Sequence, residues 1–474
     1  MNASRREFLR AGSGLLAAAS RPGLGFHAPM ALGLAGLGAM AAQSAHAADT
    51  SGYKALVCLF MAGGSDQHNW IVPTDATGYA DYARVRQELA WPRGQLLPIT
   101  SSHQGSGRSF GMPLELQPLQ ALYEAGQCAV VANVGPLEQP LTQAQYLAGG
   151  AGLPSKLFSH NDQQSMWQAL APEGAPSGWG GRMGDLLASA NPHPVFTAVS
   201  AAGNAVFLSG SSVIPYRVGL DGPLAIRGLG EPWLHGSSTA AAALARVLKM
   251  EGDTLYQAEV RRTVQRSLET AAALQAALQA SPVPALPTAP LTLPGGARIV
   301  LAGDPLAKQL RVVAQMIAAA PRMGMRRQVF MVQLGGFDSH SHQMHDQPLL
   351  MARVAQSAAW FHGTLAGLGM GSNVTLFTAS DFGRTLVSNG DGSDHGWGSH
   401  HLVLGGAVRG RTIQGRFPVT ALGTADDVGS GRLLPTTSVT QLAASLGAWI
   451  GLGTDELRTV LPTLGRFGAG PVLF

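Results

Sequence analysis

Short apolar runs recur along the chain and are separated by longer segments with helical spacing. A bounded run of about four to eight apolar residues is typical of a strand that is buried on both faces. The predicted strands are residues 54–61, 128–134, 195–199, 205–208, 328–334, 373–378 and 402–404. The predicted helices are residues 114–125, 238–279, 304–320, 347–368 and 440–450. This alternation predicts an α/β fold, a three-layer sandwich with helices on both faces of a central, mostly parallel sheet.

One segment interrupts this alternation. Residues 281–296, with the sequence SPVPALPTAPLTLPGG, are rich in proline and are expected to be extended. Predicted strands of the same kind lie before and after it, so we interpret it as an internal linker within a single domain, residues 48–474. A composition of 46% hydrophobic residues, with 61 Gly and 29 Pro, suits a globular protein with a large core and many tight loops.

Residues 1–47 differ in character from the rest of the chain. A twin arginine in the stretch SRREFLR precedes a long Ala/Gly/Leu run, which ends in the small-x-small sequence AHA. This pattern predicts a Tat export signal that is cleaved, and a periplasmic or secreted mature protein. A membrane anchor is the alternative. Because Arg21, Pro22 and His27 interrupt the apolar run, we expect no stable membrane span after cleavage.

The net charge changes when this segment is set aside. The whole chain has a formal charge of +4, and removal of four Arg and one Glu leaves 28 basic and 27 acidic residues, a net of +1. No basic block remains to favour nucleic acid or an anionic membrane as a partner.

Cys58 and Cys128 lie in apolar runs and are expected to be buried thiols, or a disulfide in an oxidising compartment. Two cysteines exclude a zinc site built from three or four cysteines.

Acidic and imidazole side chains follow three of the predicted strands. Ligands of open α/β sheets bind beyond the carboxyl ends of the strands. The motifs GGSDQHN, GGFDSHSHQ and SDFGRT at these ends contain Asp66, Asp338, His340, His342, Asp381 and Arg384. Carboxylate and imidazole without thiolate suit Zn, Mn, Mg, Ca or Fe ions. We therefore predict one or two divalent metal ions that would polarise an ester.

The loop 378–401, TASDFGRTLVSNGDGSDHGWGSHH, adds Asp394 and His395 in a chain that is only 13% charged. An isolated aspartate after a strand is usually a turn former or a helix N-cap, and a structural Ca²⁺ site is a further interpretation. The coincidence of three such loops favours a ligand site. We interpret the neighbouring pair His400 and His401 as solvated.

A fourth loop, KLFSHNDQQSMW, places Ser159 beside His160. Ser159 is a candidate nucleophile and His160 a candidate acid, base or ligand, although Ser159 or Asp162 would also serve as a helix cap. Arg384 is a candidate clamp for an oxyanion because its guanidinium is planar, with a loop salt bridge as the alternative.

Together these motifs resemble those of domain-of-unknown-function family 1501, a family of Tat-exported bacterial proteins. The residues that carry the resemblance are the twin-arginine leader, GGSDQHN, SHNDQQSMWQ, GGFDSHSHQ, SDFGRT, and DHGWG followed by LVLGGAVRG. The resemblance runs from about residue 54 to the C-terminus. That family in turn resembles a distant branch of the alkaline phosphatase and sulfatase superfamily, which implies an alkaline-phosphatase-like fold.

The superfamily resemblance implies roles for individual residues. Asp338, His395 and either His342 or His340 would hold one ion, and Asp66 and Asp381 a second. Ser159 is the nearest candidate for the nucleophile. Phe382 stands where the superfamily has a histidine, so the second ion would lose an imidazole unless Asp394 or His68 replaces it.

The predicted function is a periplasmic metal-dependent hydrolase of phosphate or sulfate esters, acting on a small ester or anionic substrate. The alternative is a secreted, non-catalytic binding or assembly protein of the same fold that retains a partial metal site. Phe382 favours this alternative.

Overall fold

The computed structural model describes residues 48–474, apart from positions 102, 151, 225–232, 235 and 249–253. The predicted export signal, residues 1–47, lies outside the described residues. Residues 49–474 cluster as one compact unit. Within the described part of the chain, no helix has the length and apolar character needed to cross a membrane.

The largest sheet is mixed, with a parallel centre. Its strand order is β16-β5-β15-β12-β1-β11-β6-β7-β8, and β17 also pairs with β5. The parallel centre comprises β12 (Val374–Ser380), β1 (Lys54–Met61), β11 (Arg327–Leu334), β6 (Ala198–Ser200) and β7 (Tyr216–Gly219). The flanking strands are β15 (Ser399–Leu404), β5 (Cys128–Gly135), β16 (Ile413–Gln414), β17 (Thr437–Ser438) and β8 (Gly222–Pro223). Of these, β15 is antiparallel to both β12 and β5, and β8 is antiparallel to β7.

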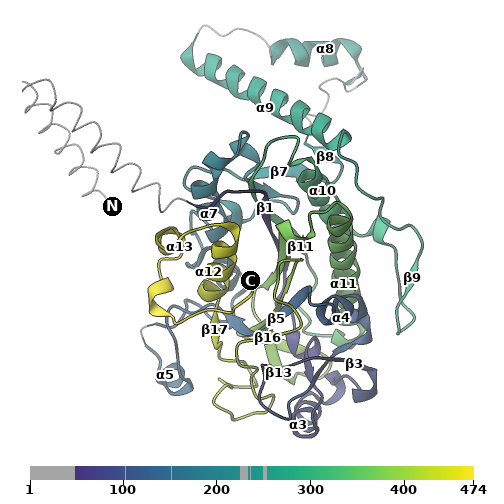
Figure 1. Cartoon of the computed structure of the whole chain (residues 1–474), viewed down its shortest axis with the longest axis vertical. Helices are drawn as coiled ribbons and strands as arrows, with labels where there is room; N and C mark the ends of the chain where they lie inside the picture. Colours follow the sequence, from purple (N-terminus) through teal and green to yellow (C-terminus); the bar gives the residue numbers. More distant parts are fainter. Residues whose placement is uncertain (1–47, 102, 151, 225–232, 235, 249–253) are drawn as a thin grey trace, which may run out of the picture. The chain divides into compact units, whose positions relative to one another are not determined.

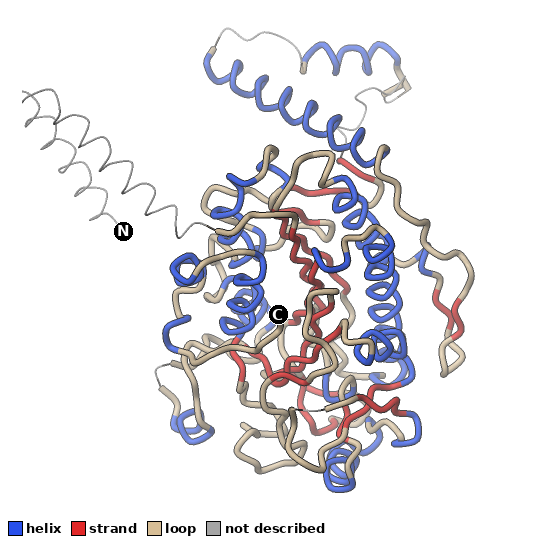
Figure 2. Tube along the Cα trace, in the orientation of Figure 1, coloured by secondary structure: helices blue, strands red, loops and turns tan. Residues whose placement is uncertain are grey.

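Helices cover both faces of this sheet, as Figures 1 and 2 show. One face carries α4 (Gln117–Glu124), α10 (Pro305–Ala319) and α11 (Gln343–Gly367). The other carries α7 (Trp179–Leu187), α12 (Val439–Ile450) and α13 (Thr454–Val460). The structure thus confirms the predicted α/β fold with a central, mostly parallel sheet.

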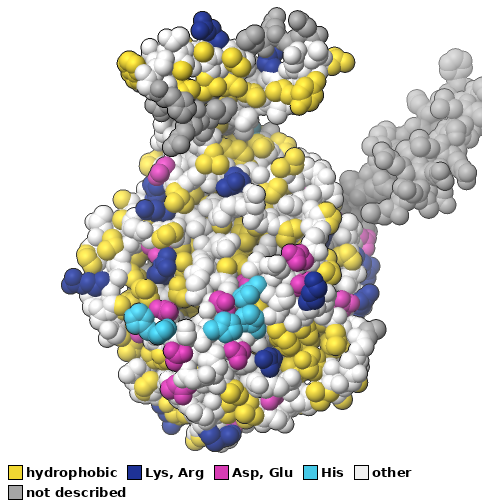
Figure 3. Space-filling view, turned by 180° about the vertical axis from the view of Figure 1, so that it is seen from behind, with side chains coloured by type: hydrophobic (Ala, Val, Ile, Leu, Met, Phe, Trp, Pro, Cys, Tyr) yellow, Lys and Arg dark blue, Asp and Glu magenta, His cyan; other side chains and the backbone are white. Residues whose placement is uncertain are grey.

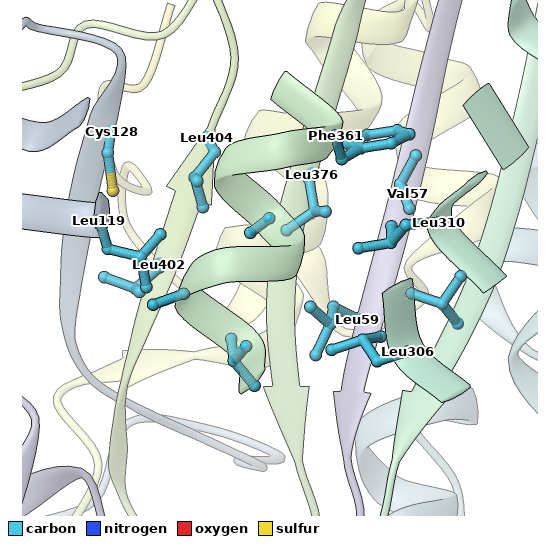
Figure 4. Packing of buried hydrophobic residues seen from close by; sticks show 14 of the residues in the cluster. Val57, Leu59, Leu119, Cys128, Leu306, Leu310, Phe361, Leu376, Leu402 and Leu404 are labelled. Carbon is cyan, nitrogen blue, oxygen red and sulfur yellow. The ribbon is translucent and has the colours of Figure 1, made fainter. Parts of the chain in front are cut away.

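The core forms because the central strands are apolar on both faces. Residues 55–61 of β1 are all buried. Figure 4 shows Val57 and Leu59 of β1 packing near Leu306 and Leu310 of α10. Burial of this apolar surface is the main source of stability in such a layer.

Both cysteines are buried free thiols, so the predicted alternative of a disulfide does not form. Cys58 lies in β1 and Cys128 in β5, and two other strands separate these in the sheet. Burial raises the pKa of both thiols, which keeps them protonated and unreactive.

The remaining elements surround this core. The other α-helices are α3 (Ala76–Arg86), α5 (Gln143–Ala148), α6 (His160–Ala169), α8 (Ser238–Val247) and α9 (Leu255–Gln279). The smaller sheets are β2 (Val72–Pro73) with β4 (Phe110–Pro113) and β3 (Leu96–Ile99), β9 (Leu291–Thr292) with β10 (Arg298–Ile299), and β13 (Arg384–Ser388) with β14 (Ser393–His395).

Three predicted elements differ from the observed ones. The strand predicted over residues 195–199 is observed only from Ala198 onward, as β6, because Pro194–Phe196 form a 3₁₀ helix. Residues 205–208 were predicted as a strand, but Val206–Leu208 form a 3₁₀ helix. Its apolar side chains are buried all the same, which is why a short apolar run alone does not distinguish the two. The single helix predicted over residues 238–279 is two helices, α8 and α9.

The proline-rich stretch is packed against the domain, because Leu286 and Leu293 are buried in a cluster with Ile299.

Candidate metal centre

The loops that follow β12, β1 and β11 leave the sheet at the same edge, because these three strands are adjacent and parallel. Hydrogen bonds join the loops to one another. The Gly63 N–H donates to Asp381 Oδ1 at 3.0 Å, and Arg384 donates to the Gly63 carbonyl at 3.2 Å. Gly63 has φ +118°, and a Cβ there would lie 2.4 Å from the Asp338 nitrogen, so only glycine fits this contact.

Four polar side chains, from the loop after β11, from α6 and from β14, converge at this edge. His160, Asp338 and His395 each offer a ligand atom, and these atoms lie within 4.8 Å of one another. Nε2 of His395 is 3.3 Å from Asp338 Oδ1, and Nε2 of His160 is 3.5 Å from Asp338 Oδ2. His340 adjoins them, with its Nε2 3.2 Å from Asp338 Oδ1 and 2.8 Å from His395 Nε2. In Figure 3, histidine and acidic side chains gather on one face of the molecule.

A buried carboxylate orients the ring of His160, which is the first residue of α6. Asp381 Oδ2 lies 2.7 Å from His160 Nδ1 and also accepts from Gln164 Nε2, at 2.7 Å, while its Oδ1 accepts from the Gly63 N–H. A carboxylate with these donors acts as an acceptor toward His160, so Nδ1 carries a proton, and in the neutral form of the ring the Nε2 lone pair faces Asp338. The hydrogen bond to Asp381 raises the pKa of His160.

The other two rings are oriented in the same way. Nδ1 of His395 lies 2.7 Å from the Phe158 carbonyl, which can only accept, and Nδ1 of His340 lies 3.1 Å from Asp394 Oδ1. Hydrogen bonds from Asn389 and His340 lower the pKa of Asp394. Burial is the main reason that the pKa of His395 is lowered. In their neutral forms both rings therefore direct an Nε2 lone pair toward Asp338.

Asp338 is the carboxylate at the middle of this arrangement, and its side chain is 44% exposed. Burial alone would raise the pKa of Asp338, but the hydrogen bond from Arg384 at 2.8 Å and the nearby imidazoles lower it below its ordinary value. The carboxylate is thus ionised at neutral pH. Arrangements of this kind, with imidazoles held by outer hydrogen bonds around a carboxylate, are typical of metal sites.

Asp66, a predicted metal ligand, does not belong to the cluster of His160, Asp338 and His395. Its side chain is 0% exposed and forms an ion pair with Arg86 of α3, while Gln343 also donates to it. Its other oxygen caps a short 3₁₀ helix through the His68 N–H. The positive partner of Asp66 is therefore a guanidinium.

The space next to Asp381 is filled by Phe382, which is fully buried. Its ring centroid lies 4.5 Å from that of His395 and 4.9 Å from that of His160. The predicted replacements for the missing imidazole make other contacts. His68 is buried with Nε2 on the Arg384 carbonyl at 3.2 Å, and Asp394 bonds to His340.

The remaining predicted residues lie around the cluster without entering it. The Ser159 hydroxyl donates to Asp162 at 3.1 Å. Arg384 is fully buried, and its guanidinium is occupied by Asp338 and by the Ser393 and Gly63 carbonyls. His342 is exposed, and its backbone N–H donates to Asp391.

His400 and His401 are buried in β15, so their interpretation as a solvated pair is wrong. The ring of His400 stacks on Phe417 with centroids 4.3 Å apart, and the ring of His401 lies 4.6 Å from that of Trp167. Burial lowers the pKa of both residues and keeps them neutral. The reason is that β15 lies inside the sheet, between β12 and β5.

Sequence reasoning did not single out Gln164, Arg86, Phe158 or Arg432. Arg432 donates to the His395 carbonyl at 2.8 Å and lies over the Phe158 ring at 5.0 Å. The sequence spacing could have identified Gln164, because it lies one helical turn after His160 on α6. The Phe158 carbonyl had none, since every residue has such a group.

The chain matches, over residues 53–466, the family described as Protein of unknown function (DUF1501), and it belongs to that family. No curated protein is matched by the chain. Among solved structures, the PsFucS1 sulfatase from Pseudoalteromonas sp. aligns over 85% of this chain and 68% of its own, with 8% identity and a TM-score of 0.34. Ps i-CgsB in complex with k-i-k-neocarrahexaose aligns over 88% and 77%, with 10% identity and a TM-score of 0.34.

Proposed function

We propose that this chain is an exported, metal-dependent hydrolase of phosphate or sulfate esters, and that it uses one divalent ion bound by His160, Asp338 and His395. The observation that carries the proposal is the convergence of lone pairs at this point. With both rings in their neutral form, the two Nε2 atoms and the ionised carboxylate all present acceptors, and acceptors that face one another are unfavourable unless a cation, here a divalent ion in place of an imidazolium proton, lies between them.

The distances within the cluster fit a metal ion. Ligand atoms at about 2.0–2.1 Å from a tetrahedral ion lie roughly 3.3 Å apart. The separations of 3.3 Å and 3.5 Å from Asp338 to His395 and His160 are close to this value. Imidazole ligands favour zinc or iron, and the carboxylate also suits manganese, whereas calcium and magnesium prefer oxygen ligands throughout. Three protein ligands leave a further position open, as in catalytic zinc sites.

The chain's own residues would hold this centre rigid. When bound, a divalent ion supplies positive charge that polarises an ester oxygen and acidifies water. Asp381 fixes the ring of His160, and Arg384 fixes the carboxylate of Asp338. His340 lies at the rim with Nδ1 on Asp394, where its imidazolium form could donate the Nε2 proton to a leaving oxygen.

The ester class and the location are supported by the sequence. The motifs around Asp338, Asp381 and His395 resemble those of the alkaline phosphatase and sulfatase superfamily, whose members cleave such esters. The twin-arginine leader supports export through the Tat pathway to the periplasm. The clustering of residues 49–474 as one unit supports a single domain after the leader.

Hydrolysis of an aryl phosphate and an aryl sulfate by protein purified without chelator tests the proposal. We expect turnover of at least one ester, loss of turnover with chelator, and recovery on addition of zinc, manganese or iron. His395→Ala should abolish turnover with the fold intact by circular dichroism. His345→Ala, which removes an exposed histidine paired with Asp346, is the matched control. Absence of turnover of both esters by folded, metal-loaded protein would contradict the proposal.

A second candidate is a secreted binding or assembly protein of the same fold. It is favoured by three placements: the Ser159 hydroxyl lies on Asp162, the Arg384 guanidinium is fully occupied, and Asp66 is paired with Arg86. If His340 were a fourth ligand, the ion would be enclosed, as in structural zinc sites. In that case His395→Ala should lower the thermal stability of the metal-loaded protein, with no activity to lose.

A further inference from the structure

A polar groove lies beside the candidate metal centre. It has a volume of about 370 Å³, within the range of roughly 300–1,000 Å³ that is usual for small-molecule sites. Its lining includes Asn161, Gln164, Ser165, Gln168, Asn204 and Gln333. The groove adjoins the centre because Gln164 also bonds to Asp381, the residue that orients His160.

One face of α6 forms a wall of this groove. Residues 161, 164, 165 and 168 have the i, i+3, i+4, i+7 spacing that places side chains on a single helix face. All four are polar, whereas Met166 and Trp167 of the same helix are buried in the core. These residues come from the motif SHNDQQSMWQ, of which the metal centre uses only His160 directly.

The groove presents unused hydrogen-bonding groups. The side-chain amides of Asn161, Asn204 and Gln333 make no hydrogen bond to any part of the chain that the structure describes. Gln168 accepts the Phe207 N–H through Oε1, at 3.2 Å, which leaves its amide N–H groups available. Gln164 donates to Asp381 and keeps its own Oε1. Each amide offers both donors and an acceptor, which suits hydroxyl groups.

The charge of the groove disfavours a strongly anionic ligand within it. Glu173 is the charged residue among those that line it, and no lysine or arginine does so. Gly174 and the small apolar residues Ala175, Ala205 and Val206 complete the lining. They would contact the C–H surface of a ring. A neutral ligand rich in hydroxyl groups fits this combination better than a peptide with large apolar side chains.

We propose that this groove binds a neutral carbohydrate unit. The link to hydrolysis rests on the proposed function, because the unit would then be the alcohol part of an ester whose anionic group lies at the metal centre. Binding of the sugar itself needs only the groove. A ligand bonded to Gln164 would also act on Asp381 and, through it, on the orientation of His160.

Saturation-transfer NMR measures whether neutral di- and trisaccharides bind to chelator-treated protein, and so tests this proposal separately from catalysis. We expect at least one neutral saccharide to bind. The double variant Asn161→Ala/Asn204→Ala should weaken its binding about tenfold, since two hydrogen bonds are lost. Both residues are exposed, so the variant should keep the wild-type melting temperature. Gln279→Ala, an exposed amide on α9, is the control and should bind as wild type.

Three results would overturn the proposal. These are no binding of any neutral saccharide at millimolar concentration, binding that the double variant leaves unchanged, and binding of anionic saccharides only. None of them depends on metal content or ester turnover. An inactive protein that still binds a neutral saccharide through Asn161 and Asn204 would refute the hydrolase and leave the groove proposal standing.

Discussion

Two aspartates at the same edge of the sheet have opposite surroundings. Asp66 follows β1 in the sequence GGSD, and Asp338 follows the adjacent parallel strand β11 in the sequence GGFD. The side chain of Asp66 is fully buried against Arg86, whereas that of Asp338 is 44% exposed among imidazoles. The same local sequence therefore gives a structural ion pair in one loop and a candidate metal ligand in the other.

The elements that pack against each loop make this difference. Arg86 of α3 and Gln343 of α11 reach Asp66, and they supply donors that satisfy its charge. His160 of α6 and His395 of β14 reach Asp338, and in their neutral forms they supply acceptors there. Both aspartates also accept from a guanidinium of the chain, Arg86 at Asp66 and Arg384 at Asp338. The imidazoles beside the exposed carboxylate are therefore what distinguishes the candidate metal ligand.

The largest expected effect comes from removal of the buried carboxylate. Asp66→Ala should lower the free energy of unfolding by about 3–5 kcal/mol, because it leaves Arg86 buried without its counter-ion. Urea denaturation measures this. Asp338→Ala, the matched change in the exposed loop, should cost less, because this carboxylate is partly solvated and Arg384 keeps the Ser393 and Gly63 carbonyls as acceptors. Equal costs for the two variants would erase the distinction between the loops.

Because several histidines are buried near the candidate metal centre, we expect the protein to lose stability in acid. Burial lowers the pKa of His68 to about 4 and that of His401 to about 3, while unfolded histidine titrates near 6.5. The unfolded state therefore binds protons first, and the free energy of unfolding should fall as the pH decreases from about 6.5 to about 4. The contribution of His68 is on the order of 3 kcal/mol.

Urea denaturation at several pH values measures this dependence, and His68→Gln should make it less steep, while His400 and His401 keep their part of it. His345→Gln, a change at an exposed histidine, should leave it as in the wild type. A His68→Gln protein with the wild-type dependence on pH would show that burial does not hold this ring neutral.

The next largest effect is expected at Asp381, which holds the ring of the candidate metal ligand His160. Asp381→Asn should weaken zinc binding about 10- to 100-fold, because His160 loses the carboxylate that fixes its ring. Competition with a chromophoric chelator measures the affinity. Asp346→Asn is a matched control, since Asp346 bonds to an exposed imidazole, His345, at 2.8 Å outside the centre. Identical zinc affinities for both variants would remove Asp381 from the account.

The smallest expected effect is at Arg432, a positioning residue. Its Nε donates to the His395 carbonyl, and its guanidinium lies over the ring of Phe158, which has a left-handed backbone with φ 71°. Arg432→Gln should weaken zinc binding by no more than about tenfold while the melting temperature of the metal-free protein stays within error. Arg458→Gln, which breaks an exposed pair with Asp455, should have no effect on zinc. A large drop in melting temperature with unchanged zinc affinity would make Arg432 purely structural.

The sequence predicted the central layer well because its strands are apolar throughout. The bounds predicted for β1 match the structure, and the three adjacent strand ends led directly to Asp338. The prediction for residues 205–208 was wrong because a buried 3₁₀ turn has the same apolar signature as a short strand. The solvated interpretation of His400 failed because polar residues gave no sign that β15 lies between two other strands.

The candidate site was predicted only in part. His160, Asp338, His340 and His395 were all among the candidates, and the structure brings them together. The pairing of Asp66 with Arg86 was not predictable, because it depends on how α3 packs against the loop after β1. The acceptor for His395 is a backbone carbonyl, which has no side-chain signature.

Elemental analysis of the protein, purified without chelator, measures whether the site formed by His160, Asp338 and His395 holds a metal ion. We expect about one equivalent of zinc, iron or manganese per chain, the number that a single three-ligand site holds. The ion should be lost in His395→Ala and retained in His345→Ala. A folded protein that binds no ion, even after incubation with these metals, would rule out this site, and a second equivalent that disappears in Asp66→Asn would show a further site at Asp66.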